Sequence, residues 1–336
     1  MDADTKEVHR LIQILVPVFN EEGSIDTFFR GIAPTIAAVT DRYSGLRFEF
    51  LFVNDGSRDR TVDAILNSAE RTVPAQVLTL SRNFGKEAAI TAGLAEANAD
   101  CAIIIDVDLQ DPPEVISEMV DRWVAGAKVV VGKRVDRRED TLAKRLTARW
   151  FYGLHNSISN VKIPTDVGDF RLIDRAVIDA LNELKENGRF MKGLFAWVGF
   201  PTETVEYKRR KRAVGESRFS AWKLWSFAID GITSFSNAPL VMWSYIGAFI
   251  SATSIAYAAY IVIRTLVFGI DVPGYASLLV GMLFLGGIQL LGIGIIGEYV
   301  GRIYSEAKRR PPYIISEKHE TRAVTDKETK SRSKAT

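Results

Sequence analysis

The sequence predicts an α/β protein with a mostly parallel sheet, helices on both faces, and two C-terminal transmembrane helices. In the first half of the 336 residues, short apolar segments alternate with amphipathic ones, a pattern typical of such a sheet. In the second half, two long runs carry no charged residue and are long enough to span a bilayer. Acids and turn formers follow several predicted strands, and in these sheets ligands bind beyond the carboxyl ends of the strands.

Five apolar segments rich in β-branched residues are predicted as strands, and the four segments between them as helices. The last of these helices begins with Pro112 and Pro113, and proline is tolerated in the first helical turn because the missing N–H has no partner there. The predicted strands are 10–19, 48–55, 76–81, 101–108 and 127–134, and the predicted helices are 20–39, 59–70, 85–97 and 112–126.

The two uncharged runs are 240–263 and 275–296, and the transmembrane helices predicted from them span about 240–264 and 275–298. Lysine and arginine gather on both outer sides of this pair, in 207–225 and 301–313, whereas the connector carries only Arg264. Because cytoplasmic flanks are enriched in positive charge, we expect both ends of the pair in the cytoplasm. Six glycines in or next to the second run suit close packing of helices in lipid, within the chain or in a homo-oligomer. An equally good interpretation is that a helix shielded by lipid simply tolerates glycine. The six are Gly281, Gly286, Gly287, Gly292, Gly294 and Gly297.

These features divide the chain into four regions. A cytoplasmic α/β domain is expected over 1–215, and an amphipathic helix lying in the headgroup layer over 216–239, where aromatic and polar residues are interleaved. A soluble helix packed on the domain is the alternative for that second region. The two spans occupy 240–301, and a basic, polar cytoplasmic tail follows over 302–336, predicted to be disordered from about residue 316.

Composition narrows the classes of function. The net charge of +2 does not favour nucleic acid as a partner. One cysteine, Cys101, excludes an internal disulfide framework, and with three scattered histidines no cysteine or histidine metal cluster is expected. The N-terminus lacks the apolar core of a signal peptide, so we expect the first domain to stay where it is made.

The segment IIIDVDLQDPPE, residues 103–114, places acids directly after a buried strand. On an extended chain, residues two apart point the same way, so Asp106 and Asp108 could share one hard cation. Gln110 could supply a third oxygen if the extended geometry persists. Mg²⁺ and Mn²⁺ prefer such oxygen ligands, and substrate phosphates usually complete the coordination of Mg²⁺. The pattern therefore predicts a divalent cation at this edge of the sheet.

Two other predicted strands end in a similar way. Asp55 stands at a tight turn in VNDGSRD, where it could accept hydrogen bonds from a base or a ribose, or cap a helix. In SRNFGKEAAI, Arg82 and Lys86 surround a glycine at the start of a helix, which is a favourable place for phosphate.

Five motifs, VPVFNEE, NDGSRD, RNFGKEAAITAGL, DVDLQDPPE and DVGDFRL, occur in a recognisable order and spacing. With them the chain resembles the inverting glycosyltransferases of family two, and in particular the polyisoprenyl-phosphate branch, which includes dolichol-phosphate mannose synthase and the bacterial bactoprenol glucosyl transferases. The resemblance implies a GT-A catalytic domain, and the two C-terminal spans resemble the bacterial members. The expected location is the bacterial cytoplasmic membrane, with the catalytic domain facing the cytoplasm.

The resemblance also implies roles on the donor side. The donor would be a nucleoside diphosphate sugar, UDP-linked, with glucose or a similar sugar. Asp106 would lie beside the diphosphate, while Asp108 and Gln110 hold Mg²⁺ or Mn²⁺. The residues implied in nucleotide binding are Pro17, Phe19, Asn20, Glu22, Asp55 and Lys86.

On the acceptor side, the resemblance implies an undecaprenyl or other polyprenyl phosphate. Its phosphate would contact Arg134 and a basic segment that contains Lys144, Arg145 and Arg149. Asp169 would orient sugar hydroxyls or the acceptor, and Asp166 and Arg171 are possible sugar contacts. The product would be a lipid-linked sugar for the cell envelope, formed with inversion.

Two other functions are weighed against this one. A processive polysaccharide synthase of the same superfamily usually carries Gln-x-x-Arg-Trp, whereas the nearest segment here, 146–150, has Leu146 in place of the glutamine. A non-catalytic membrane scaffold or lipid-flipping partner would not need the intact acids Asp106 and Asp108.

Overall fold

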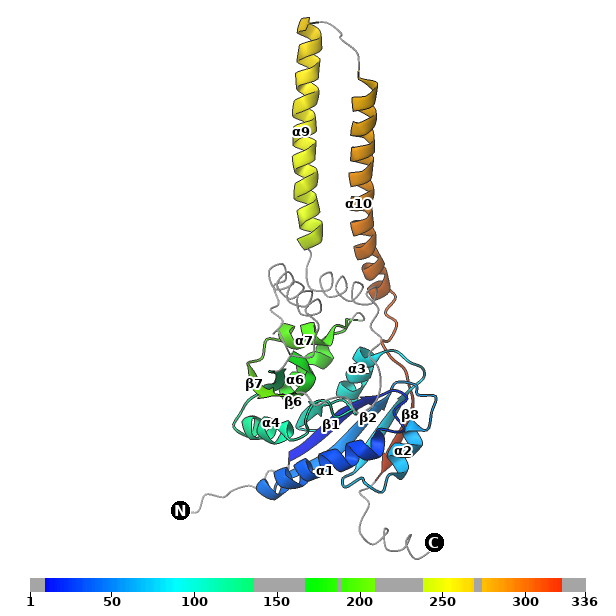
Figure 1. Ribbon diagram of the computed structural model, residues 1–336, viewed down its shortest axis with the longest axis vertical. Helices are drawn as coiled ribbons and strands as arrows, with labels where there is room; N and C mark the ends of the chain where they lie inside the picture. Colours follow the sequence, from blue (N-terminus) through cyan, green and yellow to red (C-terminus); the bar gives the residue numbers. More distant parts are fainter. Residues whose placement is uncertain (1–9, 136–166, 187–188, 209–237, 269–273, 322–336) are drawn as a thin grey trace, which may run out of the picture.

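The structure is a computed structural model that describes residues 10–135, 167–186, 189–208, 238–268 and 274–321. Within them, a domain built around one sheet carries two long helices that project from it side by side (Figure 1). The sheet has eight strands in the order β7-β5-β6-β4-β1-β2-β3-β8. They are β1 (Arg10–Val18), β2 (Leu46–Asn54), β3 (Ala75–Leu80), β4 (Cys101–Ile104), β5 (Val129–Arg134), β6 (Val167–Asp174), β7 (Thr202–Tyr207) and β8 (Ile315–Thr321).

The sheet is mostly parallel, as predicted. Strand β1 pairs in parallel with β2 and β4, and β3 with β2, whereas β6 is antiparallel to its neighbours β4 and β5. The five predicted strands correspond to β1 to β5. The sequence reading did not predict β6, β7 or β8, because their segments lack the long apolar runs of central strands.

Helices cover both faces of the sheet. One core joins the sheet to α1 (Ile25–Arg42), α2 (Thr61–Asn67) and α4 (Val115–Val124), and includes an edge-to-face cluster of Phe28, Phe29, Phe50 and Phe52. On the other face, apolar side chains of α3 (Lys86–Glu96), α6 (Arg175–Glu183) and α7 (Met191–Trp197) pack on the sheet. This second layer lies on the side of the sheet toward the two long helices (Figure 1).

The long helices are α9 (Ala238–Phe268) and α10 (Tyr275–Ala307). Both are long and apolar enough to cross a membrane, over Leu240–Phe268 and Phe284–Ala307. Of the six glycines named in the second run, only Gly292 is closely approached by a described residue, because a Cβ atom there would lie 2.2 Å from Trp243 Nε1. Around the other five, nothing described lies within 4 Å of such an atom.

The expectation of a disordered end from residue 316 is wrong for the first six of those residues. After α10 the chain returns to the domain, and β8 pairs antiparallel with β3. Lys318 forms an ion pair with Glu96 at 2.5 Å, and Thr321 Oγ1 donates to Ala75 O. The polar residues of β8 suit an edge strand, whose outer side faces water. The proposed interfacial region 216–239 lies outside the described residues except at its end, where α9 begins.

Candidate active site

The carboxyl ends of β1, β2 and β4 border a cavity of about 300 Å³. Its lining contains six of the residues that the sequence selected, namely Pro17, Phe19, Asp55, Lys86, Asp106 and Asp108. The cavity therefore lies where a parallel sheet normally binds its ligand. Phe19 is 42% exposed at the opening, which leaves an aromatic face available to a planar group.

Asn20 and Glu22 are not among the lining residues of this cavity. Asn20, at a positive φ of 55°, accepts a hydrogen bond from Arg58 N at 2.9 Å, and Glu22 accepts one from Arg60 N at 2.9 Å. Asn20 N also donates to Ser57 Oγ. These contacts brace the loop after β1 against the loop after β2.

Asp55 supports the loop that leads into α3. Its side chain is buried and accepts hydrogen bonds from Phe84 N at 2.7 Å and Gly85 N at 2.9 Å. Burial raises the pKa of Asp55, although these two N–H groups oppose the rise. The neighbouring Gly56 has φ 71°, and a Cβ there would lie 2.5 Å from the Arg82 backbone. Only glycine therefore permits this approach of the two loops.

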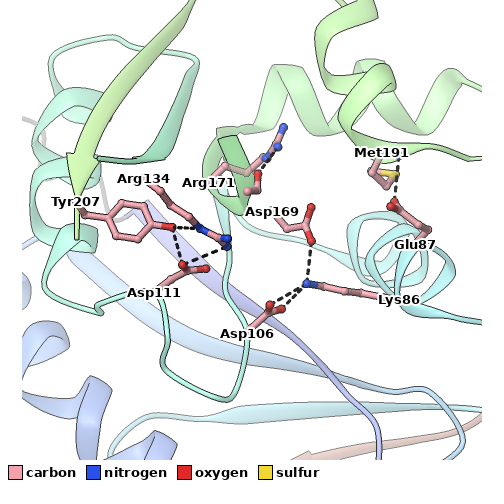
Figure 2. Close-up of polar contacts among 10 residues, drawn as sticks. Lys86, Glu87, Asp106, Asp111, Arg134, Asp169, Arg171, Met191 and Tyr207 are labelled. Atoms are coloured by element: carbon pink, nitrogen blue, oxygen red, sulfur yellow. Dashed lines mark hydrogen bonds and ion pairs between the residues drawn. The ribbon is translucent and has the colours of Figure 1, made fainter. Parts of the chain in front are cut away.

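Lys86, the first residue of α3, joins two acids from different parts of the chain. Its Nζ lies 2.6 Å from Asp106 Oδ1 and 2.8 Å from Asp169 Oδ2 (Figure 2). Burial alone would raise the pKa of Asp169, but Lys86 and Lys192 outweigh it and lower that pKa to about 2. Asp169 is therefore a carboxylate at neutral pH, able to accept hydrogen bonds but not to donate a proton.

Asp106 and Asp108 both line the cavity and offer oxygen ligands for a divalent cation. The described residues contain no group of three or more histidine, cysteine or acidic side chains that could hold a metal by themselves. Two carboxylates completed by substrate phosphates are nevertheless a usual Mg²⁺ arrangement, so the residues present fit such an ion. The expected extended geometry is wrong beyond Ile104, where β4 ends, because Val107 and Asp108 form a turn and Leu109 has a φ of 49°. The side chain of Gln110 is buried and is not among the residues that line the cavity.

Arg134, at the end of β5, is held by two residues that the sequence reading did not select. Its Nε donates to Tyr207 Oη at 3.3 Å, and its Nη2 lies 3.6 Å from Asp111 Oδ1 (Figure 2). Tyr207 Oη in turn donates to Asp111 at 2.5 Å. Asp111 belongs to the acidic segment 103–114, so the sequence could have identified it as a site residue. Tyr207 could not be identified in this way, because it ends a strand that the sequence did not predict.

Glu87 and Arg171 lie behind the acids, beside α7. Glu87 accepts a hydrogen bond from Met191 N at 3.0 Å, and burial together with the Asp169 carboxylate raises the pKa of Glu87 to about 7. The Arg171 side chain leaves β6 in a direction away from Asp106 (Figure 2) and stacks on Phe195. The remaining predicted contacts, Lys144, Arg145, Arg149 and Asp166, lie outside the described residues.

Comparisons with known proteins show which family the chain belongs to. The family model described as Glycosyl transferase family 2 matches residues 13–181. The chain belongs to this family. It is therefore a glycosyltransferase, and the mostly parallel sheet with helices on both faces confirms the predicted fold class.

Two curated relatives are similar over nearly the whole chain. The bactoprenol glucosyl transferase of Shigella phage SfV is 51% identical, over 90% of this chain and 97% of that protein. The SfII prophage-derived bactoprenol glucosyl transferase of Shigella flexneri is 50% identical, over 92% and 98%. Among solved structures, mannosyl-3-phosphoglycerate synthase from Rubrobacter xylanophilus is 17% identical with a TM-score of 0.47, over 72% of this chain and 77% of that one.

Proposed function

We propose that this protein transfers a sugar, glucose or a similar one, from a UDP-linked donor to undecaprenyl phosphate in the bacterial cytoplasmic membrane. The observation that carries the proposal is the 50–51% identity, over at least 90% of the chain, to proteins named bactoprenol glucosyl transferase. The cavity beside Asp106 and Asp108, and two helices suited to a bilayer, support it.

On the donor side, the cavity residues bind and orient the nucleotide sugar. Phe19 offers its exposed ring to the base, while Asp55 and its turn fix the loop that presents Lys86. Asp106 and Asp108 would hold Mg²⁺ or Mn²⁺, which would supply Lewis acidity at the leaving diphosphate. The ammonium group of Lys86 adds a second positive charge beside the same position.

On the acceptor side, the nucleophile is an oxygen of a phosphate monoester, which is already anionic at neutral pH. No strong base is required, and basic side chains such as Arg134 hold the phosphate against the charge of the donor. Asp169 accepts hydrogen bonds from the sugar or orients the acceptor. Attack from the face opposite the diphosphate inverts the anomeric centre.

The membrane helices hold this chemistry at the height of the lipid headgroup. Helices α9 and α10 are proposed to cross the bilayer, with the catalytic domain on the cytoplasmic side. The acceptor phosphate would lie at that surface with its chain in lipid, and the product would serve envelope glycosylation.

The proposal is tested with purified protein, undecaprenyl phosphate, and UDP-glucose among a panel of nucleotide sugars, with the lipid product identified by mass. Asp108→Ala should reduce transfer at least ~10²-fold while the protein stays folded, because the side chain lines the cavity rather than the core. Asp41→Ala, at an exposed acid of α1, is the matched control and should transfer normally. A wild-type protein that forms no lipid product with any donor would contradict the proposal.

A further inference from the structure

The loop between β3 and α3, residues 81–85, supplies two residues to the cavity of the candidate active site. Asn83 and Gly85 line this cavity, together with Lys86 at the start of α3. The loop forms neither helix nor strand, and Gly85 has a φ of 99°, in a region that residues other than glycine rarely adopt. Contacts from other parts of the chain are therefore needed to keep the loop in the conformation that presents these residues.

Phe84 is the residue of this loop that packs into the protein instead of lining the cavity. Its N–H donates to Asp55 Oδ1 at 2.7 Å, and the guanidinium carbon of Arg82 lies 4.2 Å from the centre of its ring. The ring packs against an apolar cluster between the sheet and α3, which includes Leu80 and Ala89. Ala89 also lines the cavity, so the cluster and the donor site share a wall. The position of Phe84 therefore depends on how firmly this cluster is packed.

Two residues of the chain that returns from α10 pack against the same cluster. They are Tyr313 and Ile315, and this part of the chain passes beside α3 on its way to the sheet (Figure 1). Ile315, the first residue of β8, pairs with the last residue of β3. At the base of the loop, Ser81 N donates to Ile314 O at 2.9 Å. The returning chain therefore holds the loop in two ways, by a backbone hydrogen bond and through the cluster that receives Phe84.

These contacts lie at the outer edge of the sheet. Strand β8 is the last strand of the sheet, and the side chains of Tyr313 and Ile315 are both partly buried. Shortening either side chain would leave space at the edge of the cluster, because the surroundings of a truncated residue relax only partially. The Phe84 ring would then be held less firmly. A misplacement of about 1 Å in groups that position a substrate can cost ~10²-fold, so a looser loop would weaken the donor site.

We propose that Tyr313 and Ile315 are positioning residues for the nucleotide. They hold Phe84, and through it the loop that carries Asn83 and Lys86 to the cavity. Neither side chain lines the cavity, so both act through the loop and not by touching the nucleotide. The inference rests on the proposed function and deepens it, because it makes binding of the donor depend on the chain that returns from the membrane helices.

The first measurement is amide hydrogen exchange in the full-length protein in detergent, with no nucleotide present. In Tyr313→Ala, the segment 82–86 should exchange about tenfold faster or more, because the two N–H groups bonded to Asp55 lose protection when the loop loosens. Tyr313→Phe, which keeps the ring, should exchange like wild type. Thr321→Val is the matched control, since it removes the hydrogen bond to Ala75 O at the far end of the same strand. It should leave the exchange of this segment within about twofold of wild type.

The second measurement is the affinity for UDP in the presence of Mg²⁺, determined by calorimetry on the same variants. The dissociation constant should rise about fivefold or more in Tyr313→Ala, and less than about twofold in Tyr313→Phe and Thr321→Val. Ile315→Ala is a second variant with the same expected effect as Tyr313→Ala. In the transfer assay, the KM for the nucleotide sugar should rise by a similar factor while the KM for the lipid acceptor stays the same. A general loss of stability would not separate the two KM values in this way.

Unchanged exchange of the segment 82–86 in both Tyr313→Ala and Ile315→Ala would overturn the inference. An equal rise in exchange over the whole sheet would also overturn it, because the two residues would then have a purely structural role. Faster exchange of the loop with unchanged UDP affinity would show that the loop does not position the nucleotide. If the wild-type protein bound no UDP, the proposed donor would fail, whereas faster exchange of the loop would still support its dependence on the returning chain.

Discussion

Lys86 Nζ lies between carboxylates that are far apart in the sequence. Asp106 follows the buried strand β4, whereas Asp169 is on β6, which is antiparallel to β4. Without the ammonium group, these two carboxylates would repel each other across a partly buried space. Lys86 therefore joins β4 and β6 beside the cavity and places a positive charge where a diphosphate is proposed to bind.

Tyr207 forms hydrogen bonds with both Asp111 and Arg134, and the substitution Tyr207→Phe tests how much these contacts contribute. The substitution removes the hydroxyl that donates to the buried Asp111 and accepts from Arg134 Nε. Leaving a buried carboxylate short of one donor should lower the free energy of unfolding by about 1–3 kcal/mol, measured by chemical denaturation in detergent. The KM for the lipid acceptor should also rise, because Arg134 loses one of the contacts that fix it.

Tyr43→Phe provides the comparison for this variant. Tyr43 also donates to a carboxylate, Asp121, but that acid is 40% exposed and can be solvated by water. The smaller loss of stability expected there would isolate the effect of burial. Equal losses in the two variants would show that the Tyr207–Asp111 contact has no special importance.

At this scale the sequence identified many cavity residues but not their supports. Pro17, Asp106 and Asp108 directly follow or end apolar strands, so their position could be read from the local pattern. Tyr207 contacts Arg134 from β7, and a Cβ atom added at Gly168 of β6 would lie 3.1 Å from Arg134 Nη2. The pairing of these strands depends on contacts between residues far apart in the chain. Asn20 and Glu22 were selected because they lie in a motif, and the structure shows their side chains in contacts between loops.

Among the elements, α3 and α7 are joined through Glu87, and this contact should respond to pH. The pKa of Glu87 is about 7 in the folded protein against an ordinary value of 4.5, so folding favours the protonated carboxyl. Its contribution to stability is fully present below about pH 4.5 and is lost as pH rises toward 7. The melting temperature, measured from pH 5 to 8, should therefore fall less steeply with rising pH in Glu87→Gln than in wild type, because glutamine stays neutral. Parallel curves would contradict this account.

Helices α9 and α10 approach each other at Gly292. Gly292→Val should push Trp243 away and destabilise the helix pair by about 1–3 kcal/mol, because the side chain has no space to occupy. A lower melting temperature in detergent and a shifted tryptophan emission would report it. Gly294→Val is the matched control, since nothing described lies within 4 Å of its added Cβ. The two variants should behave alike only if the helices do not pack at this point.

For the whole molecule, the prediction of a membrane protein rests on two uncharged runs in the sequence, 240–263 and 275–296. Such runs can be recognised from sequence alone because a helix that crosses a bilayer must be long and apolar. The protein should remain in the membrane pellet after an alkaline carbonate wash and enter solution only with detergent. Release by the wash would show that the helices do not span the bilayer. The return of the chain to the sheet as β8 could not be predicted, because its polar sequence becomes a strand only where β3 offers a free edge.

The return of the chain as β8 also determines at which end of the sheet Thr321 lies. Strand β8 starts beside Leu80, at the edge of the sheet that contains the cavity, and finishes beside Ala75 at the opposite edge (Figure 1). The connection 308–314 between α10 and β8 can span no more than roughly 25 Å even when fully extended. It therefore limits the distance between the end of α10 and the sheet. A fluorescent label or affinity tag attached after Thr321 would therefore be joined to the chain at the end of the sheet opposite the cavity.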